Sequence, residues 1–187
     1  MSTSTGPSAA EIDRVRELTS IGAGHAAGAL AVLTGRTCEM KVPRVQAASV
    51  SDPGLTGVLF ELTGGTGGVL ALFFPPATRD RLLRQLLGPD LTRAEGARSA
   101  LCEVGNILAS HAVSALAEMV GEPMLPSPPQ LALTDAAAAF AELLAQRHGA
   151  TPALRIETEI VDRAGELRGI LVFVPDTPLR FAPTTGF

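Results

Sequence analysis

The chain has 187 residues, 46% of them hydrophobic, which is enough for one well-packed core and too few for two domains of ordinary size. Its net charge is −4 and its Lys and Arg residues are scattered, so the sequence offers no basic stripe for a phosphate backbone. The 7 Phe residues, with no Trp or Tyr, leave little surface on which bases could stack, and composition therefore argues against nucleic acid as a partner.

The sequence also lacks the marks of export or membrane insertion. Its first residues have neither the basic start nor the apolar stretch of a signal peptide, and no apolar run approaches the ~20 residues that span a membrane. We therefore expect a cytoplasmic protein. Cys38 and Cys102 have no His or Cys at metal-ligand spacing around them, and both are predicted to be buried, reduced thiols.

One long helix is expected near the N-terminus, because apolar residues recur at helical spacing from Ala9 to Gly35. Residues 1–8 are small and polar and are predicted to be a disordered tail. The glycines of Ile21–Gly24 lower helix propensity, so we expect either a kink there or a close contact with another helix.

Extended structure is predicted after this helix. Cys38–Val50 is expected to be extended, with an interruption at Pro43. Val58–Leu62 and Val69–Phe74 flank a glycine-rich turn and predict a β-hairpin. The glycine run is not followed by a helix with Lys and Ser or Thr, so it lacks the pattern of a phosphate-binding loop.

Two helices and a short apolar segment come next. Arg79–Leu87 is predicted to be a short helix, ended by the Gly-Pro pair that follows it. A long helix is expected from an N-cap at Asp90 or Thr92 to Gly121, and Leu131–Leu133 follows a proline-rich crossing.

The remaining elements are an Ala-rich helix and a second hairpin. The helix is predicted to be capped by Thr134 or Asp135 and to end near Arg147. Leu154–Val161 and Gly169–Val174 then predict a hairpin with a short turn.

The order of predicted elements in the first half recurs in the second, which indicates an internal repeat. A shift of 86 positions aligns residues 17–35 with residues 103–121 without a gap, and Glu, Ile, His, Leu and the closing Gly coincide together with four Ala residues. The hairpins also correspond if the second copy carries the extra Ala-rich helix. We expect a duplicated unit with a pseudo-two-fold axis: one domain over 9–175, copies over 9–88 and 90–175, and a tail over 176–187.

Polar side chains line one face of the second long helix. Ser99, Glu103 and Asn106 fall at i, i+4 and i+7, which places them along one side. The opposite side carries an apolar stripe that must face the core: Leu101, Val104, Leu108, Ala112 and Ala115. Taken alone, such a triplet is most simply a solvated helix face.

The first copy repeats this spacing with Asp13, Glu17 and Ser20. A proline follows each triplet at a similar distance, where the returning chain could support the helix: Pro43 in the first copy, and Pro128 or Pro129 in the second.

The pattern Ser-x3-Glu-x2-Asn-x21-Pro, from Ser99 to Pro128, resembles the active-site motif of the CheC, CheX and FliY family of phosphatases. The surrounding Glu-Val-Gly-Asn-Ile-Leu, and Ser-Ile-Gly-Ala-Gly-His-Ala-Ala in the first copy, look like the CheC branch. The resemblance covers Ala9 to Pro175. We expect an α/β fold with one continuous, mainly antiparallel sheet, on which the two long motif helices pack with their polar edges exposed.

The resemblance implies hydrolysis of the aspartyl phosphate on phosphorylated CheY, the chemotaxis response regulator. Asn106 would orient the attacking water, and Glu103 would pair with a lysine of the regulator. Mg²⁺ would come from the regulator, so no cofactor of the chain's own is expected. CheD, a receptor-modifying deamidase, is a further partner that the resemblance implies.

The first copy departs from the family pattern at Ser20, where the family has Asn. A serine hydroxyl has a shorter reach and no carbonyl, so Asp13, Glu17, Ser20 and Pro43 are predicted to form a degenerate second site. The matched histidines His25 and His111 lie about 140° round the helix from the proposed water-positioning residue and are predicted to be buried or interfacial. His148 is given no catalytic role.

A second class of function stays open: a non-catalytic adaptor that binds CheY or CheD, or a docking component related to the flagellar switch. The intact Glu103 and Asn106 favour an enzyme over an adaptor. The lack of an additional C-terminal domain argues against the FliY type, and the two copies argue against the single-motif CheX type.

Overall fold

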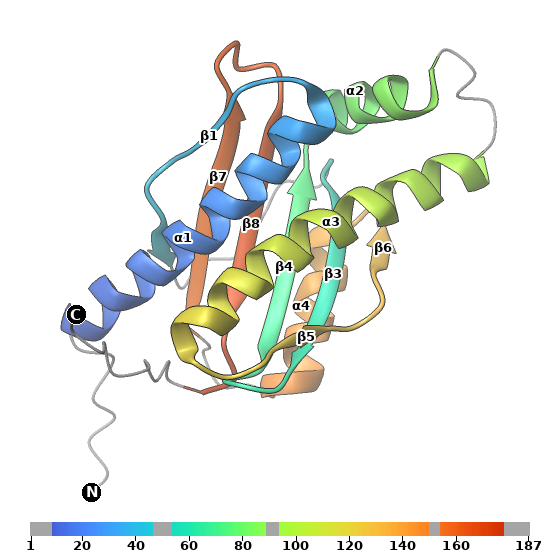
Figure 1. Cartoon of the computed structure of the whole chain (residues 1–187). Coiled ribbons are helices and arrows are strands. Elements are labelled where there is room, and N and C mark those ends of the chain that lie inside the picture. Colours follow the sequence, from blue (N-terminus) through green and yellow to red (C-terminus); the bar gives the residue numbers. More distant parts are fainter. Residues whose placement is uncertain (1–8, 47–53, 89–93, 150–153, 178–187) are drawn as a thin grey trace, which may run out of the picture.

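The computed structural model describes residues 9–46, 54–88, 94–149 and 154–177 (Figure 1). The predicted tail over residues 1–8 lies outside these ranges, as do the proposed caps Asp90 and Thr92 and all but two residues of the predicted C-terminal tail.

The described residues contain four helices: α1 (Ala9–Thr34), α2 (Pro76–Leu87), α3 (Ala94–Val120) and α4 (Ala136–His148). All four were predicted from the sequence. Helix α2 starts three residues before the predicted Arg79, because a proline fits the first turn, where its missing N–H has no partner to lose. Asp135 precedes α4, as predicted for a cap, but its side chain makes no capping hydrogen bond.

Eight strands form one sheet in which every pairing is antiparallel, as expected. The main order is β1-β7-β8-β4-β3-β5, with β2 also paired to β7 and β6 to β3. The extended segment after α1 is interrupted near Pro43, as predicted. The strands are β1 (Cys38–Met40), β2 (Arg44–Gln46), β3 (Thr56–Thr63), β4 (Gly68–Phe74), β5 (Leu125–Pro126), β6 (Gln130–Ala132), β7 (Arg155–Asp162) and β8 (Arg168–Val174).

The short strands cross over between the two halves of the chain. β1 and β2 pair with β7, and β5 and β6 pair with β3, while β4 and β8 meet at the centre of the sheet. β2 and β6 are separated by the same 86 positions that align the long helices, since Arg44 corresponds to Gln130. This arrangement agrees with the expected pseudo-two-fold relation.

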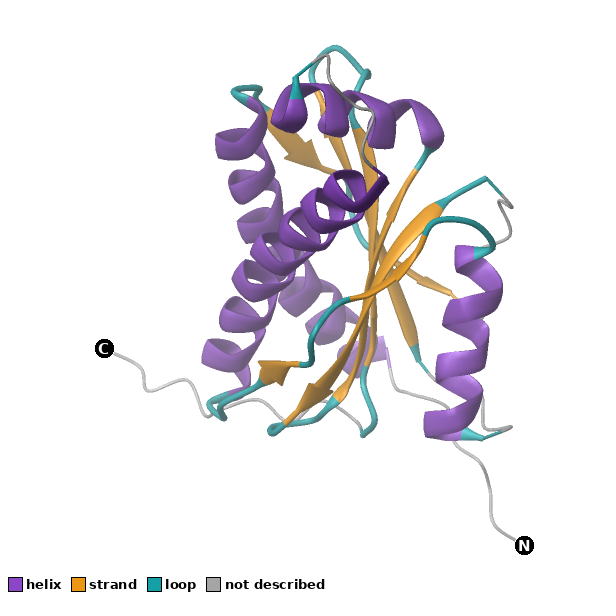
Figure 2. Cartoon of the chain, turned by 90° about the vertical axis from the view of Figure 1, so that its right-hand side faces the viewer, coloured by secondary structure: helices purple, strands orange, loops and turns teal. Residues whose placement is uncertain are grey.

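Helices cover both faces of the sheet (Figure 2). α1, α2 and α3 bury the larger apolar cluster on one face, and α4 buries a smaller cluster around Phe73 and Phe140 on the other. The predicted apolar stripe of α3 is buried, from Leu101 to Ala115. Its segment Gly96–Val120 is long and apolar enough to cross a membrane by composition, but half of the most apolar part is buried inside the protein, as in a core helix.

The two long helices touch through a glycine. A Cβ built at Gly22 would lie 3.3 Å from the carbonyl oxygen of Ala112 and 3.4 Å from Cγ of Leu116. Helix α1 continues through this point without interruption. Of the two alternatives for Ile21–Gly24, a kink or a close helix contact, the structure has the contact, because the missing side chain lets the helices approach.

The turn between β7 and β8 is fixed by a buried carboxylate. Asp162 Oδ1 accepts hydrogen bonds from the N–H groups of Glu166 (2.7 Å) and Leu167 (2.9 Å), and Arg36 Nη1 donates to Oδ2 at 2.7 Å. Burial acts to raise the pKa of Asp162, but the N–H of Leu167 and the Arg36 guanidinium outweigh it and hold the pKa below its ordinary value. Asp162 thereby joins the end of α1 to the hairpin of the second half.

Candidate active site on the second long helix

The polar triplet of α3 lies on its outer face, as the sequence predicts. Ser99 and Glu103 are exposed, and Asn106 is half-buried. Within the part of the chain that the structure describes, none of these three side chains has a hydrogen-bond or ion-pair partner. Their donors and acceptors are therefore available to a docked molecule.

The chain returning after each long helix runs beside it toward its N-terminus. In the first half, a Cβ built at Gly24 would lie 3.9 Å from Sδ of Met40. In the second half, the returning chain forms β5 and β6, and both strands lie near α3.

The segment around Pro128 is held to the sheet by its neighbour. Ser127 N–H donates to the carbonyl oxygen of Glu61 at 2.8 Å, and the Glu61 N–H donates to Ser127 Oγ at 3.0 Å. Pro128 itself is exposed, whereas Pro129 is half-buried and Pro43 is buried. The returning chain is thus fixed to β3 directly before Pro128.

On the corresponding face of α1, the polar side chains interact with other residues of α1. Ser20 Oγ donates to the carbonyl oxygen of Arg16 at 2.8 Å, and Arg16 Nη1 lies 3.5 Å from Asp13 Oδ1. Glu17 is exposed. Sequence reasoning missed Arg16, whose counterpart at the offset of 86 is the uncharged Cys102, so this face carries a cation that the second half lacks.

Of the two alternatives for the matched histidines, burial within the chain is wrong, because both His25 and His111 are exposed, and a place in an interface stays a prediction. α1 and α3 pack onto the core through small and aliphatic residues next to these histidines, such as Ala26 and Ala112. The larger, polar imidazole rings stay on the surface. The cysteines are free, as predicted, but half-buried rather than buried, and burial raises the pKa of the Cys38 thiol. His148 packs near Asp176, away from α3.

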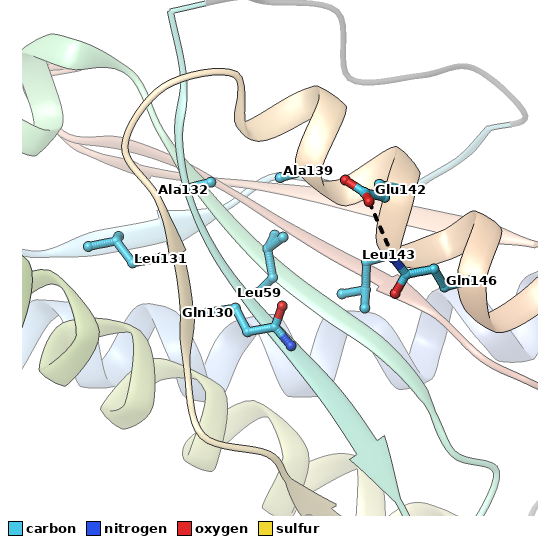
Figure 3. Close-up of a pocket in the computed structure, with 8 residues that line it drawn as sticks. All are labelled: Leu59, Gln130, Leu131, Ala132, Ala139, Glu142, Leu143 and Gln146. Carbon is cyan, nitrogen blue, oxygen red and sulfur yellow. Dashed lines mark hydrogen bonds between the residues drawn. The ribbon is translucent and has the colours of Figure 1, made fainter.

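A cavity of about 300 Å³ lies between β6 and α4 (Figure 3). Its lining includes Leu59 and Leu143 of the smaller apolar cluster, and Gln146 Nε2 donates to Glu142 Oε1 beside it at 3.4 Å. It is therefore on the face of the sheet opposite α3 and is separate from the candidate site. Among the described residues, no three His, Cys, Asp or Glu side chains cluster as metal ligands would.

Comparisons with known proteins agree with the motif. A sequence model described as the CheC-like family matches residues 97–132, which include the whole triplet and Pro128. The CheY-P phosphatase CheC of Bacillus subtilis is 29% identical over 184 residues, covering 89% of this chain and 88% of that protein. The segment that carries the motif is thus similar to the CheC-like family, and most of the chain is similar to a CheC protein.

Solved structures share the CheC-like fold. The chemotaxis protein CheX from Desulfovibrio desulfuricans superposes with a TM-score of 0.66 at 18% identity, covering 84% of this chain and 97% of that one. CheX in the CheX-CheY-BeF₃-Mg²⁺ complex from Borrelia burgdorferi superposes with a TM-score of 0.58 at 17% identity, covering 82% and 95%. The CheC-like family model and the curated relative thus support a chemotaxis phosphatase at the level of the family.

Proposed function

We propose that the protein hydrolyses the aspartyl phosphate of a phosphorylated CheY-type response regulator, and that Asn106 and Glu103 of α3 carry this activity. The observation on which the proposal rests is this pair of exposed or half-buried side chains, which have no partner among the described residues and lie on a helix whose opposite face is buried, within the segment that matches the CheC-like model. An acyl phosphate is already activated, so a protein can hydrolyse it without a nucleophile of its own.

In this proposal Asn106 positions the attacking water. Its carboxamide oxygen accepts a hydrogen bond from the water, and its NH₂ group donates to a phosphoryl oxygen or to the regulator. The water oxygen forms a bond to phosphorus while the bond to the aspartyl oxygen breaks, which releases inorganic phosphate and a free carboxylate. The regulator, and not this chain, would hold the Mg²⁺ ion that neutralises the phosphoryl charge.

Glu103 supplies the docking contact. It lies three residues before Asn106 on the same side of α3, so a cation of the regulator paired with Glu103 would bring the phosphoryl group toward Asn106. Ser99 and Pro128 have supporting roles at the same face of α3 as Glu103 and Asn106. The relative in B. subtilis is named a CheY-P phosphatase, and the Borrelia CheX was solved with CheY, which supports a CheY-type partner. Binding of CheD and a cytoplasmic location stay predictions.

The test is the rate at which acyl phosphate disappears from phosphorylated CheY with wild type, Asn106→Ala and Ser20→Ala. We expect wild type to accelerate the loss, Asn106→Ala to lower kcat at least about 10²-fold, and Ser20→Ala to behave as wild type, because a misplaced or missing water ligand costs about that much. Wild type without activity, or Asn106→Ala as fast as wild type, would contradict the mechanism. Binding of CheY without turnover would instead support the adaptor.

A further inference from the structure

Gly105, between Glu103 and Asn106, marks the closest approach of α3 to the sheet. A Cβ built at Gly105 would lie 2.5 Å from Cγ1 of Val58 and 2.9 Å from its Cβ. Real Cβ atoms essentially never come so close to another heavy atom. Any residue other than glycine at this position therefore requires α3 or β3 to move.

β3 is poorly placed to move. Val58 is fully buried, and it is paired on one side with Leu72 of β4 and on the other with Leu131 of β6. Its side chain can rotate only into the packed core around it. The displacement caused by a larger residue at position 105 would thus be taken up mainly by α3.

The first half lacks this close approach. The residue that corresponds to Gly105 at the offset of 86 is Thr19, which has a Cβ and is buried. The half that carries Asn106 therefore also carries the glycine, and the half that carries Ser20 does not. The two differences fall on adjacent residues of the helix, one facing the sheet and the other on the polar outer face.

We propose that Gly105 is a positioning residue: by allowing α3 to rest directly on Val58, it sets the height of Asn106 above the sheet and so its distance from the phosphoryl group of a docked regulator. Asn106 is the next residue on a rigid helix, so a shift of the backbone at 105 moves its carboxamide by a similar amount. The catalytic part of this inference rests on the proposed function.

The test adds a methyl group at position 105 that clashes with Val58, and then shortens the Val58 side chain to reduce the clash. We expect Gly105→Ala to lower kcat by about 10²-fold, as for a ~1 Å misplacement, while KM for phosphorylated CheY changes less than about threefold because the exposed, flexible Glu103 side chain can follow its partner through such a shift. Val58→Ala removes both Cγ atoms but keeps the Cβ, 2.9 Å from the added methyl group, so the double variant should recover only part of the loss and have a kcat at least about threefold above that of Gly105→Ala. Gly28→Ala is the matched control, since its added methyl group meets no atom within 4 Å.

A second variant guards against misfolding of Gly105→Ala. Val58→Ile adds a methyl group to the branch that Cγ2 occupies, 3.2 Å from a Cβ built at Gly105, and should lower kcat in the same direction without changing the sequence of α3. The side-chain amide signals of Asn106 in NMR spectra, assigned with Asn106→Ala, should shift in Gly105→Ala and return part of the way in the double variant. Unchanged kcat and amide shifts in Gly105→Ala, or no rescue in a folded double variant, would overturn the proposal. If wild type has no activity, the proposed function fails and the amide shifts alone decide the positioning.

Discussion

Glu103 is an exposed carboxylate without a partner in the described chain, so its contribution depends on what docks against α3. Glu103→Gln keeps the size of the side chain and removes its charge. We expect KM for phosphorylated CheY to rise about tenfold, with a smaller change in kcat, because a charged docking contact mainly fixes the complex. The difference from wild type should shrink as salt is added. Steady-state kinetics at two ionic strengths measure it, and an unchanged KM would exclude the docking role.

Ser20 is tied to its own helix, and Arg16 lies beside it. In an Asn106→Ala background, where activity can come only from the first half, we expect Ser20→Asn to restore less than about a tenth of the wild-type rate, because Arg16 repels the cation that Glu17 would attract. Adding Arg16→Cys, the residue at the equivalent position, should raise that rate. A full return of activity with Ser20→Asn alone would show that only residue 20 disables this face.

Residue patterns on one helix could be predicted from the sequence, and contacts between elements could not. The exposure of Glu103 follows from its spacing against the apolar stripe, which helical periodicity fixes. The burial of His25 and His111 was predicted wrongly because helical periodicity gives the direction in which a side chain points. It does not give how much of the helix surface the neighbouring elements cover. The approach of Gly105 to Val58 joins residues in different elements, and no local pattern marks it.

At the scale of elements, the buried carboxylate at the β7–β8 turn makes stability depend on pH. The folded pKa of Asp162 lies below its unfolded value, so its stabilisation is fully present above about pH 4 and is lost as pH falls through the folded pKa. We expect Asp162→Asn to lower the free energy of unfolding at pH 7 by about 1.5–3 kcal/mol, the range for hydrogen bonds to charged groups.

Denaturant unfolding of both proteins between pH 7 and pH 3 measures this effect. The stability of Asp162→Asn should fall less steeply with acid than that of wild type, because the variant has no carboxyl to protonate at the turn. Glu166→Gln serves as the control, since Glu166 contacts the same Arg36 from an exposed position and should matter less. Equal acid sensitivity in wild type and Asp162→Asn would contradict the role given to this carboxylate.

The ends of helices and strands were predicted correctly where the sequence carries a local signal, such as a glycine or a turn. The glycines after α1, α2 and α3 end those helices as predicted, and both hairpins lie where apolar runs flank turns. The pairing of β1 and β2 with β7 was not visible, because it joins residues as distant as Cys38 and Asp162, and strands of three residues carry too little pattern to specify a partner.

At the scale of the whole molecule, the crossed pairing predicts that neither half folds alone. A fragment over residues 9–88 has no partner for β1 and β2, and its central strand β4 loses β8. We expect poor dispersion of its amide signals and no cooperative unfolding, and an equimolar mixture with residues 89–187 should recover both. Cooperative unfolding of either fragment alone would contradict this.

Because β1 and β2 complete the sheet of the opposite half, each half is in thermodynamic terms the ligand of the other. Separate copies of such a unit would assemble by strand exchange, and their folding would depend on protein concentration. A single chain replaces that dependence with a fixed effective concentration. Assembly then requires both halves while the proposed chemistry requires one, so a serine at position 20 leaves the architecture intact.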